Sequence, residues 1–256
     1  MANSPRQQAG LSPSCLVAHR GWPSRFAENS LAGYQHALAA GGLAFETDLQ
    51  ISDDGECWLF HDVHLERLCR LPGTIFELSG QSGIVEVTGS HAVPQRLDPQ
   101  PLARLPQLVQ LMRASPETTW FWELKPESVA RHGNRRCHEL LADFFERVLN
   151  QVVLISFELT TLSFFRRHTS IRLGAVLREP DRQVRESFSE LNLEYLFCDH
   201  QHWTPEDLLD WSGSWKRVVY TINDPTTALR YLSSGADLVE TDDIGAMMGT
   251  GTKEPS

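Results

Sequence analysis

The sequence has few cysteines, no paired Cys-x-x-Cys motif and no long apolar run. Its cysteines are Cys15, Cys57, Cys69, Cys137 and Cys198. Their odd number and wide spacing predict reduced thiols rather than a disulfide framework. No window approaches the roughly 18 consecutive apolar residues that a membrane helix needs. The first residues also lack the apolar core of a signal peptide. Together these absences predict a cytoplasmic protein without stable membrane insertion.

Positive charge is scarce as well. The chain has 23 Lys and Arg against 33 Asp and Glu, a formal net charge of -10. Nucleic-acid binding depends on clustered Lys and Arg, so a nucleic-acid partner is not expected. An anionic small-molecule substrate would need local positive charge, from a few side chains or from a metal ion. With 256 residues, 41% of them hydrophobic, the chain can bury a large core.

Short apolar runs alternate with amphipathic segments along most of the chain. Strands are expected at 14–19, 43–51, 57–62, 118–125, 151–157, 171–177, 194–200, 216–222 and 236–242. Helices are expected at 30–40, 101–113, 136–149, 159–167, 205–211 and 225–233. This alternation predicts an α/β fold, a somewhat irregular TIM (β/α)8 barrel with a parallel sheet.

Two segments disturb the regular pattern. Residues 51–56 are too few for a crossover helix, so a turn should join the strands on either side. Residues 70–100 are rich in Gly, Ser, Pro and Val, which indicates an inserted lobe or loop after the third strand. The expected organisation is an N-terminal tail over 1–14, the barrel over 15–248 and a C-terminal tail over 249–256.

Polar side chains gather where four of the expected strands end. The pairs are His19 and Arg20, Glu46 and Asp48, His61 and Asp62, and Glu123 and Lys125. In a barrel these ends form one rim, where active sites are built. Residues at i and i+2 of a strand point to the same side. We therefore expect Glu46 to face the same way as Asp48, and Glu123 the same way as Lys125.

These residue types suit one kind of chemistry. Three carboxylates without a thiolate favour a hard divalent cation, Mg²⁺ or Ca²⁺. Two histidines suit general acid and base catalysis near neutral pH. Arg20 and Lys125 supply the positive charge that the composition lacks. The combination predicts cleavage of a phosphoester.

The motifs extend over nearly the whole chain. They are "AHRGWPSRFAENSLAGYQHALAAGG", "FETDLQISDDGECWLFHDVHLER", "WELK" and "VVYTINDPTTALRYLSSGADLVETD". In order and spacing they resemble the glycerophosphodiester phosphodiesterase family. The resemblance implies a TIM barrel with a segment inserted after the His61 strand. It also implies metal-dependent hydrolysis of glycerophosphodiesters to glycerol 3-phosphate and an alcohol.

The resemblance assigns a role to each matching residue. It makes His19 and His61 the catalytic acid and base. Glu46, Asp48 and Glu123 become the ligands of one divalent cation. Arg20 and Lys125 contact the phosphate, whereas Asn29 shapes the loop.

The chain departs from the family pattern at several positions. Ala27 stands where a proline usually precedes the "EN" pair, and Tyr220 replaces a tryptophan. Tyr220 and Glu28 are candidate pocket residues, and Asp242 is expected to be structural. The remaining late histidines are expected at the surface, with His200 and His202 as possible edges of the pocket. These are His132, His138, His168, His200 and His202.

Two alternatives stay open. One is a lysophospholipase D-type phosphodiesterase, with Trp22, Phe26 and Trp203 forming an apolar entrance to the pocket. The other is a phosphate-binding barrel that has lost turnover. The head group, the metal, the assignment of acid and base, and the oligomeric state also stay open.

Overall fold

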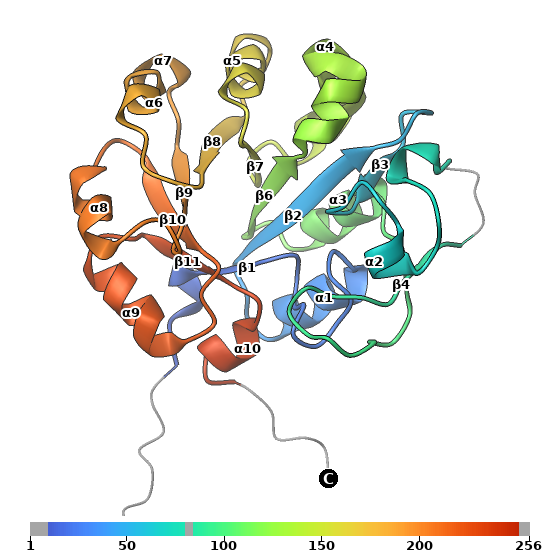
Figure 1. The fold of residues 1–256 in the computed structure, drawn as a ribbon, viewed down its shortest axis with the longest axis horizontal. Coiled ribbons are helices and arrows are strands. Elements are labelled where there is room, and N and C mark those ends of the chain that lie inside the picture. The colour runs from blue at the N-terminus through green and yellow to red at the C-terminus, as the bar shows by residue number, and fades with distance from the viewer. Residues whose placement is uncertain (1–9, 80–83, 251–256) are drawn as a thin grey trace, which may run out of the picture.

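The computed structural model describes residues 10–79 and 84–250 of the chain. Parallel strands form a closed ring with helices around its outside (Figure 1). The ring closes where the last strand, β11, pairs with the first, β1. The barrel strands, in ring order, are β1 (Leu16–Ala18), β2 (Ala44–Ile51), β6 (Thr119–Leu124), β7 (Val152–Ser156), β8 (Arg172–Leu177), β9 (Tyr195–Asp199), β10 (Lys216–Tyr220) and β11 (Leu238–Thr241). The predicted (β/α)8 barrel is confirmed.

Helices follow the strands and cover the outer face of the barrel. They are α1 (Leu31–Ala39), α3 (Leu105–Ala114), α4 (Pro126–Arg147), α5 (Leu159–His168), α6 (Arg182–Glu186), α7 (Phe188–Leu191), α8 (Pro205–Asp210), α9 (Pro225–Ser233) and α10 (Ile244–Met247). The side chains of Ser30, Thr204 and Asp224 cap three of them at the N-terminus. No described helix is both long and apolar enough to cross a membrane.

The helical pattern was incompletely predicted from the sequence. The helices α6 and α7 were not expected, and α4 begins at Pro126 rather than at residue 136. Gly133 lies inside α4 with a φ of 75°, outside helical geometry. This break interrupts the apolar periodicity, so only the second half of α4 was recognisable. All five cysteines are free thiols, and all but Cys15 are buried.

The strand predicted at 57–62 is not part of the ring. The strand β3 (Cys57–Leu59) pairs antiparallel with the far end of β2, with Leu59 opposite Leu49 and Cys57 opposite Ile51. The short turn that precedes it permits only this hairpin connection. His61 therefore reaches the barrel rim as the chain returns, and not from the end of a barrel strand. The N–H of Phe60 donates to the Asp48 carbonyl oxygen at 3.1 Å and fixes that return.

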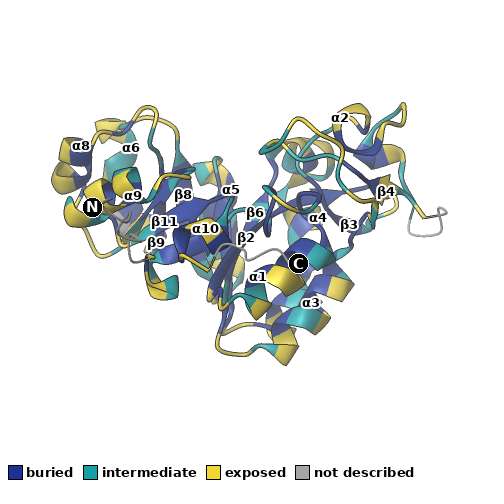
Figure 2. Ribbon diagram, turned by 90° about the horizontal axis from the view of Figure 1, so that it is seen from below, coloured by how far each residue is buried: buried dark blue, intermediate teal, exposed yellow. Residues whose placement is uncertain are grey.

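Inward-facing side chains change character along each barrel strand. The lower part of the interior is apolar, and Phe121 packs edge-to-face against Tyr195 and Phe197 there. Two residues further along β2 and β6, Glu46 and Glu123 face the same interior. The outward-facing residues of these strands pack under the helices instead, in the buried layer seen in Figure 2. Strand alternation thus places an acidic layer on an apolar floor.

The segment between β3 and α3 forms a small lobe beside the rim. It contains α2 (Glu66–Cys69), a 3₁₀ turn (Ile75–Glu77) and a short hairpin of β4 (Glu86–Val87) and β5 (Gln100–Pro101). Its own apolar cluster includes Trp58, Phe60, Leu68, Ile75 and Val87. This lobe lies where an insertion was predicted, and residues 80–83 fall outside the described part of the chain.

Of the two predicted tails, residues 1–9 and 251–256 lie outside the described residues. Residues 10–14 are described, and Leu11 is buried against the barrel. Its N–H donates to the Met247 carbonyl oxygen at 2.8 Å. The end of the expected N-terminal tail is therefore packed onto α10.

Asn29 is the polar centre of the loop between β1 and α1. Its φ is 57°, in the left-handed region that asparagine tolerates. Its side-chain oxygen accepts hydrogen bonds from Tyr34 Oη at 2.9 Å and Thr47 Oγ1 at 3.0 Å. Its amide nitrogen donates to Asp48 Oδ2 at 2.9 Å. Asn29 thus shapes the loop, as the resemblance implied, and holds a carboxylate of the rim.

Replacing Asn29 with alanine is expected to lower the free energy of unfolding by about 3 kcal/mol, because it leaves buried hydroxyls without an acceptor. Urea denaturation followed by circular dichroism measures this loss. Asn29→Gly is the matched control, since glycine adopts the same φ without strain but loses the same hydrogen bonds. A loss below about 1 kcal/mol in both variants would show that the loop does not depend on Asn29.

Candidate active site

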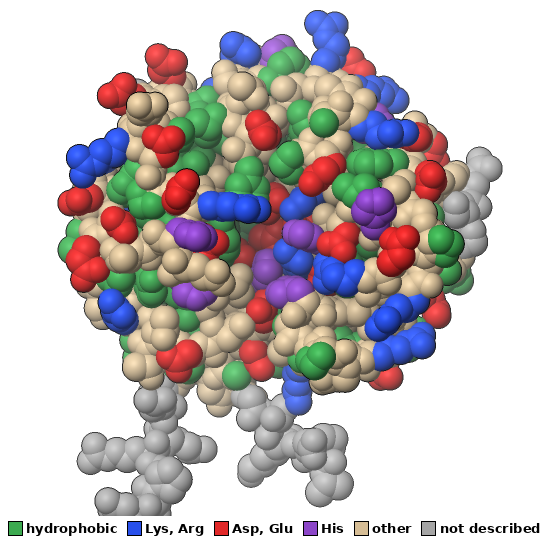
Figure 3. All heavy atoms as spheres, in the orientation of Figure 1, with side chains coloured by type: hydrophobic (Ala, Val, Ile, Leu, Met, Phe, Trp, Pro, Cys, Tyr) green, Lys and Arg blue, Asp and Glu red, His purple; other side chains and the backbone are tan. Residues whose placement is uncertain are grey.

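A pocket of about 400 Å³ opens at the carboxyl ends of the barrel strands. Histidines and basic side chains surround a central hollow with an acidic interior (Figure 3). Its lining includes six residues predicted from strand ends, together with Tyr220; these are His19, Arg20, Glu46, His61, Glu123, Lys125 and Tyr220. The structure therefore brings together at one site residues that are more than 200 positions apart in sequence.

Asp48, the remaining predicted ligand, lies beneath this lining and is fully buried. Its carboxylate is paired with Arg20 Nε at 2.9 Å and with Lys125 Nζ at 3.3 Å. Burial opposes the charged form, but Arg20 and Lys125 outweigh it and hold the pKa of Asp48 well below its usual range. Asp48 is consequently an ionised carboxylate that orients two cationic side chains.

Glu46, Asp48 and Glu123 each offer one oxygen, and these oxygens lie within 4.8 Å of one another. Burial raises the pKa of Glu46 well above its usual range, and the nearby Asp48 and Glu240 raise it further. Such crowding of buried carboxylates disfavours their joint ionisation unless a cation is present. An all-oxygen donor set of this kind fits a hard divalent cation such as Mg²⁺ or Ca²⁺. The three residues thus fit the metal expected from the sequence.

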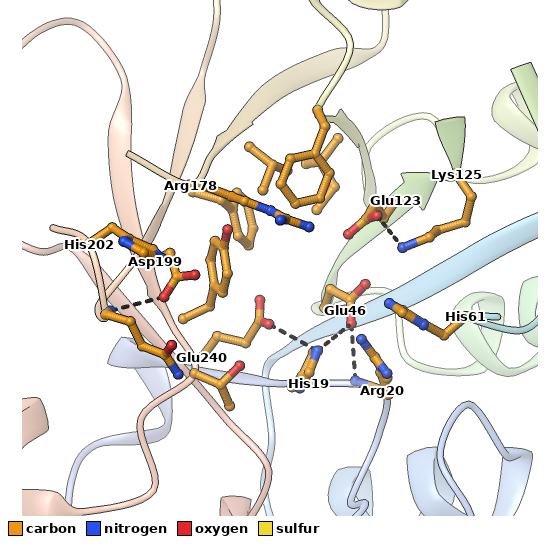
Figure 4. Close-up of a pocket in the computed structure, with 17 residues that line it drawn as sticks. His19, Arg20, Glu46, His61, Glu123, Lys125, Arg178, Asp199, His202 and Glu240 are labelled. Carbon is orange, nitrogen blue, oxygen red and sulfur yellow. Dashed lines mark hydrogen bonds and ion pairs between the residues drawn. The ribbon is translucent and has the colours of Figure 1, made fainter. Parts of the chain in front are cut away.

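His19 is oriented by a carboxylate at the end of β11. Its Nδ1 lies 2.8 Å from Asp242 Oδ1, and Figure 4 shows the ring between Glu46 and Glu240. Burial and the neighbouring Arg20 lower the pKa of His19 to about 4, in spite of Asp242. A neutral ring that donates from Nδ1 to Asp242 leaves the Nε2 lone pair facing the pocket. This tautomer suits a proton acceptor.

His61, which follows β3, is more open to solvent than His19. Its side chain is 36% exposed, and its Nδ1 lies 2.7 Å from Asp62 Oδ1. Arg67 donates to both oxygens of Asp62, at 2.6 and 2.7 Å. Arg67 also donates to Glu28, from Nη2 at 2.9 Å. The inserted lobe, through Arg67, therefore fixes the partner of His61.

His91, in the loop after β4, is a site residue that the sequence did not reveal. Its Nδ1 lies 2.9 Å from Glu28 Oε2, and its Nε2 lies 2.8 Å from Asp242 Oδ1. Burial alone lowers the pKa of His91, but the hydrogen bonds to Asp242 and Glu28 outweigh it and raise the pKa to about 9. The ring is thus a cation between two carboxylates, and it connects the lobe to the partner of His19. A lone histidine in an irregular loop carried no sequence signal for this role.

Several expectations are corrected by these contacts. Glu28 was a candidate pocket residue, but it is not among the residues that line this pocket. It is 1% exposed, behind Arg20, whose Nη1 donates to it at 2.9 Å. Asp242, expected to be purely structural, holds both His19 and His91. His202 lines the pocket, whereas His200 contacts the Tyr220 carbonyl oxygen at 3.0 Å.

Trp22, Phe26 and Trp203, the aromatic residues expected at the entrance of a lysophospholipase D-type enzyme, do not line this pocket. Trp203 is fully buried and packs edge-to-face against Trp211. Trp22 donates from Nε1 to Asp243 and packs against Phe26. These rings stabilise loops and the helical layer, and the apolar side chains that do line the pocket are Ile155, Phe157, Val176 and Phe197.

Two further residues were missed at the strand ends. Glu240 precedes Asp242 by two positions on β11, so it faces the same interior. Arg178, just after β8, lines the side of the pocket opposite His61 (Figure 4). Glu240 could have been found, because a glutamate within the apolar run "LVETD" is unusual for a buried strand.

Replacing His91 with glutamine should lower the melting temperature most at acidic to neutral pH. The folded-state pKa of His91, about 9, lies above the ordinary histidine value of 6.5. The stabilisation is therefore fully present below about pH 6.5 and is lost as the pH rises through 9. Melting curves of both proteins between pH 6 and 10 should differ by a few degrees at pH 6 and converge at pH 10. A difference independent of pH would show that His91 is not a cation held between Glu28 and Asp242.

Comparison with known proteins agrees with this geometry. Residues 19–246 match the model of the Glycerophosphoryl diester phosphodiesterase family. A glycerophosphodiester phosphodiesterase of Bacillus altitudinis is 22% identical over 177 residues, which are 66% of this chain and 71% of that protein. A human glycerophosphoinositol inositolphosphodiesterase is 44% identical over 52 residues, which are 20% of this chain and 10% of its own.

The fold also has a solved relative. A phosphodiesterase of Oleispira antarctica, in complex with the product sn-glycerol-3-phosphate, superposes with a TM-score of 0.76 at 21% identity. The match covers 93% of this chain and 97% of that chain. With the family match extending over most of the barrel, the chain belongs to the glycerophosphoryl diester phosphodiesterase family.

Proposed function

We propose that this protein hydrolyses glycerophosphodiesters to glycerol 3-phosphate and an alcohol, in the presence of Mg²⁺ or Ca²⁺. The observation that carries this proposal is the convergence of Glu46, Asp48 and Glu123 below a pocket walled by two histidines. The pocket size suits a small phosphodiester. The free thiols are consistent with a cytoplasmic location.

Arg20 and Lys125 are proposed to bind the phosphate. Both line the pocket, and both are held in place by Asp48. The carboxylates around Arg20 and Lys125 outweigh burial, which alone would lower their pKa values, and raise both. Each side chain therefore stays charged through the neutral range and positions an anionic substrate.

The two histidines divide the proton transfers. His19, neutral and with Nε2 facing the pocket, accepts a proton from the attacking water, whose oxygen forms the new bond to phosphorus as the bond to the leaving alcohol breaks. His61 donates a proton to the oxygen of the leaving alcohol. Asp242 and Asp62 orient the two rings through their Nδ1 atoms, at 2.8 and 2.7 Å. A divalent cation held by Glu46, Asp48 and Glu123 would neutralise the charge that develops on the phosphoryl oxygens.

His19→Ala and His61→Ala should each lower kcat by about 10²- to 10⁴-fold, because each removes one positioned proton carrier. Steady-state assays with glycerophosphocholine measure the loss. Binding of Mg²⁺ or Ca²⁺ by calorimetry should be retained, since neither residue belongs to the three-carboxylate set. Near wild-type turnover in either variant would remove that histidine from the mechanism.

The metal requirement is tested with chelator-treated protein. Release of glycerol 3-phosphate from glycerophosphocholine, glycerophosphoethanolamine or glycerophosphoglycerol should require added Mg²⁺ or Ca²⁺. Glu46→Ala should abolish the release, because it removes one of the converging carboxylates. Comparison of the three substrates gives the head-group preference.

Two outcomes would contradict the proposal. Full activity without metal would show that the carboxylates serve another purpose. No activity with any substrate, despite measurable binding of glycerol 3-phosphate, would favour a phosphate-binding barrel without turnover.

A further inference from the structure

Glu240 is a buried carboxylate that the proposed reaction does not use. It projects from β11 into the pocket and is 3% exposed (Figure 4). Its Oε1 lies 3.5 Å from His19 Nε2. Its Oε2 has no hydrogen-bond partner among the described residues. Ionisation of a buried carboxylate that lacks a hydrogen-bond partner costs free energy, and a positively charged partner would offset that cost.

The neighbours of Glu240 do not supply that partner. His19 Nε2 faces Glu240 at 3.5 Å and Glu46 Oε2 at 3.9 Å. Because Nδ1 donates to Asp242, the Nε2 of a neutral His19 offers a lone pair. His19, Glu46 and Glu240 thus each direct an atom with a lone pair toward the same point, and these three atoms lie within 4.8 Å of one another.

Of the three Lys and Arg side chains that line the pocket, Lys125 and Arg20 are paired with other carboxylates, and Arg178 lies over the Phe157 ring at 5.7 Å. Lys125 Nζ pairs with Glu123 at 2.6 Å and with Asp48 at 3.3 Å. Arg20 Nε pairs with Asp48 at 2.9 Å. Among the described residues, the Glu46 carboxylate accepts one hydrogen bond, from the backbone N–H of Arg20 to Oε2 at 3.1 Å. The two carboxylates without a close cationic side chain are therefore Glu46 and Glu240, on the His19 side of the pocket.

We propose that His19, Glu46 and Glu240 form a second cation position, which shares Glu46 with the three-carboxylate site. One imidazole nitrogen and two carboxylates favour a transition-metal ion such as Zn²⁺, Mn²⁺ or Co²⁺ over Mg²⁺ or Ca²⁺. The hydrogen bond from His19 to Asp242 is the usual outer support of a metal-binding histidine.

Another group, His19, His91 and Asp242, also has its donor atoms close together. There the contacts of both histidines with Asp242 Oδ1, at 2.8 Å, are already hydrogen bonds. In that group the donor atoms are already joined by hydrogen bonds, whereas no hydrogen bond joins the side chains of His19, Glu46 and Glu240. The position next to Glu240 is the one that remains for an ion.

Occupation of this position has a functional consequence that rests on the proposed function. An ion on His19 Nε2 uses the lone pair that would accept the proton of the nucleophile. Transition-metal ions should therefore inhibit the hydrolysis that Mg²⁺ or Ca²⁺ supports. The second position would act as an inhibitory metal site within the active site.

Calorimetric titration with Zn²⁺, in the presence of saturating Mg²⁺, tests the site without measuring activity. Wild-type protein should bind Zn²⁺, and Glu240→Gln should weaken that binding by at least about tenfold, since loss even of an outer partner costs this much. In ¹H–¹⁵N spectra, Zn²⁺ should shift Nε2 of His19 in the wild type but not in Glu240→Gln. Glu123→Gln should show the converse, with Mg²⁺ binding lost and Zn²⁺ binding kept.

Asp199→Asn is the matched control, because it removes another carboxylate that lines the same pocket. It should bind Zn²⁺ like the wild type. Melting of metal-free Glu240→Gln checks the fold and should occur at or above the wild-type temperature, because an uncompensated buried charge is removed.

Unchanged Zn²⁺ binding in Glu240→Gln would overturn the proposal, as would loss of the same Mg²⁺ site in Glu240→Gln and Glu123→Gln. If the protein hydrolyses no phosphodiester but Zn²⁺ binding still depends on Glu240, the proposed function fails while the second cation position stands.

Discussion

The negative charge buried at the carboxyl end of the barrel constrains most of the surrounding structure. Four carboxylates, Glu46, Asp48, Glu123 and Glu240, project into one small space and are accompanied by two cationic side chains. Buried carboxylates of this density are tolerated only where hydrogen bonds, cations or protons compensate them. Here the compensation is uneven: Asp48 is paired with two cationic side chains, whereas Oε2 of Glu240 has no hydrogen-bond partner among the described residues.

The inserted lobe takes part in the same electrostatic balance. Arg67 and His91 bring two positive charges from the lobe to Glu28, and His91 continues to Asp242. Glu28 therefore acts as a buried junction between the barrel and the lobe. Because the junction is polar, the lobe is held in register with the histidines and does not merely cover an apolar surface.

The barrel and the core of the site could be predicted because both follow strand periodicity. Glu46 and Asp48 are two residues apart on β2, so the sequence alone places them on one face. The direction of β3 could not be predicted so directly, because the apolar run at 57–62 is the same for a parallel and an antiparallel strand. His91 and Glu28 could not be placed either, since their roles depend on how an irregular loop packs against the rim. Strand periodicity therefore predicts the barrel and the site residues on its strands, whereas the site residues on loops can be located only from the tertiary structure.

Closure of the barrel links the two ends of the described chain. His19 and Asp242 are separated by 223 positions, yet their side chains form one hydrogen bond. During synthesis on the ribosome, β1 emerges long before β11, so His19 and Asp242 cannot form this hydrogen bond until β11 has also emerged. A nascent chain that has not yet released β11 has an open barrel edge and an unsupported His19. The hydrogen bond between His19 and Asp242 can therefore form only after β11 has been synthesised and has paired with β1.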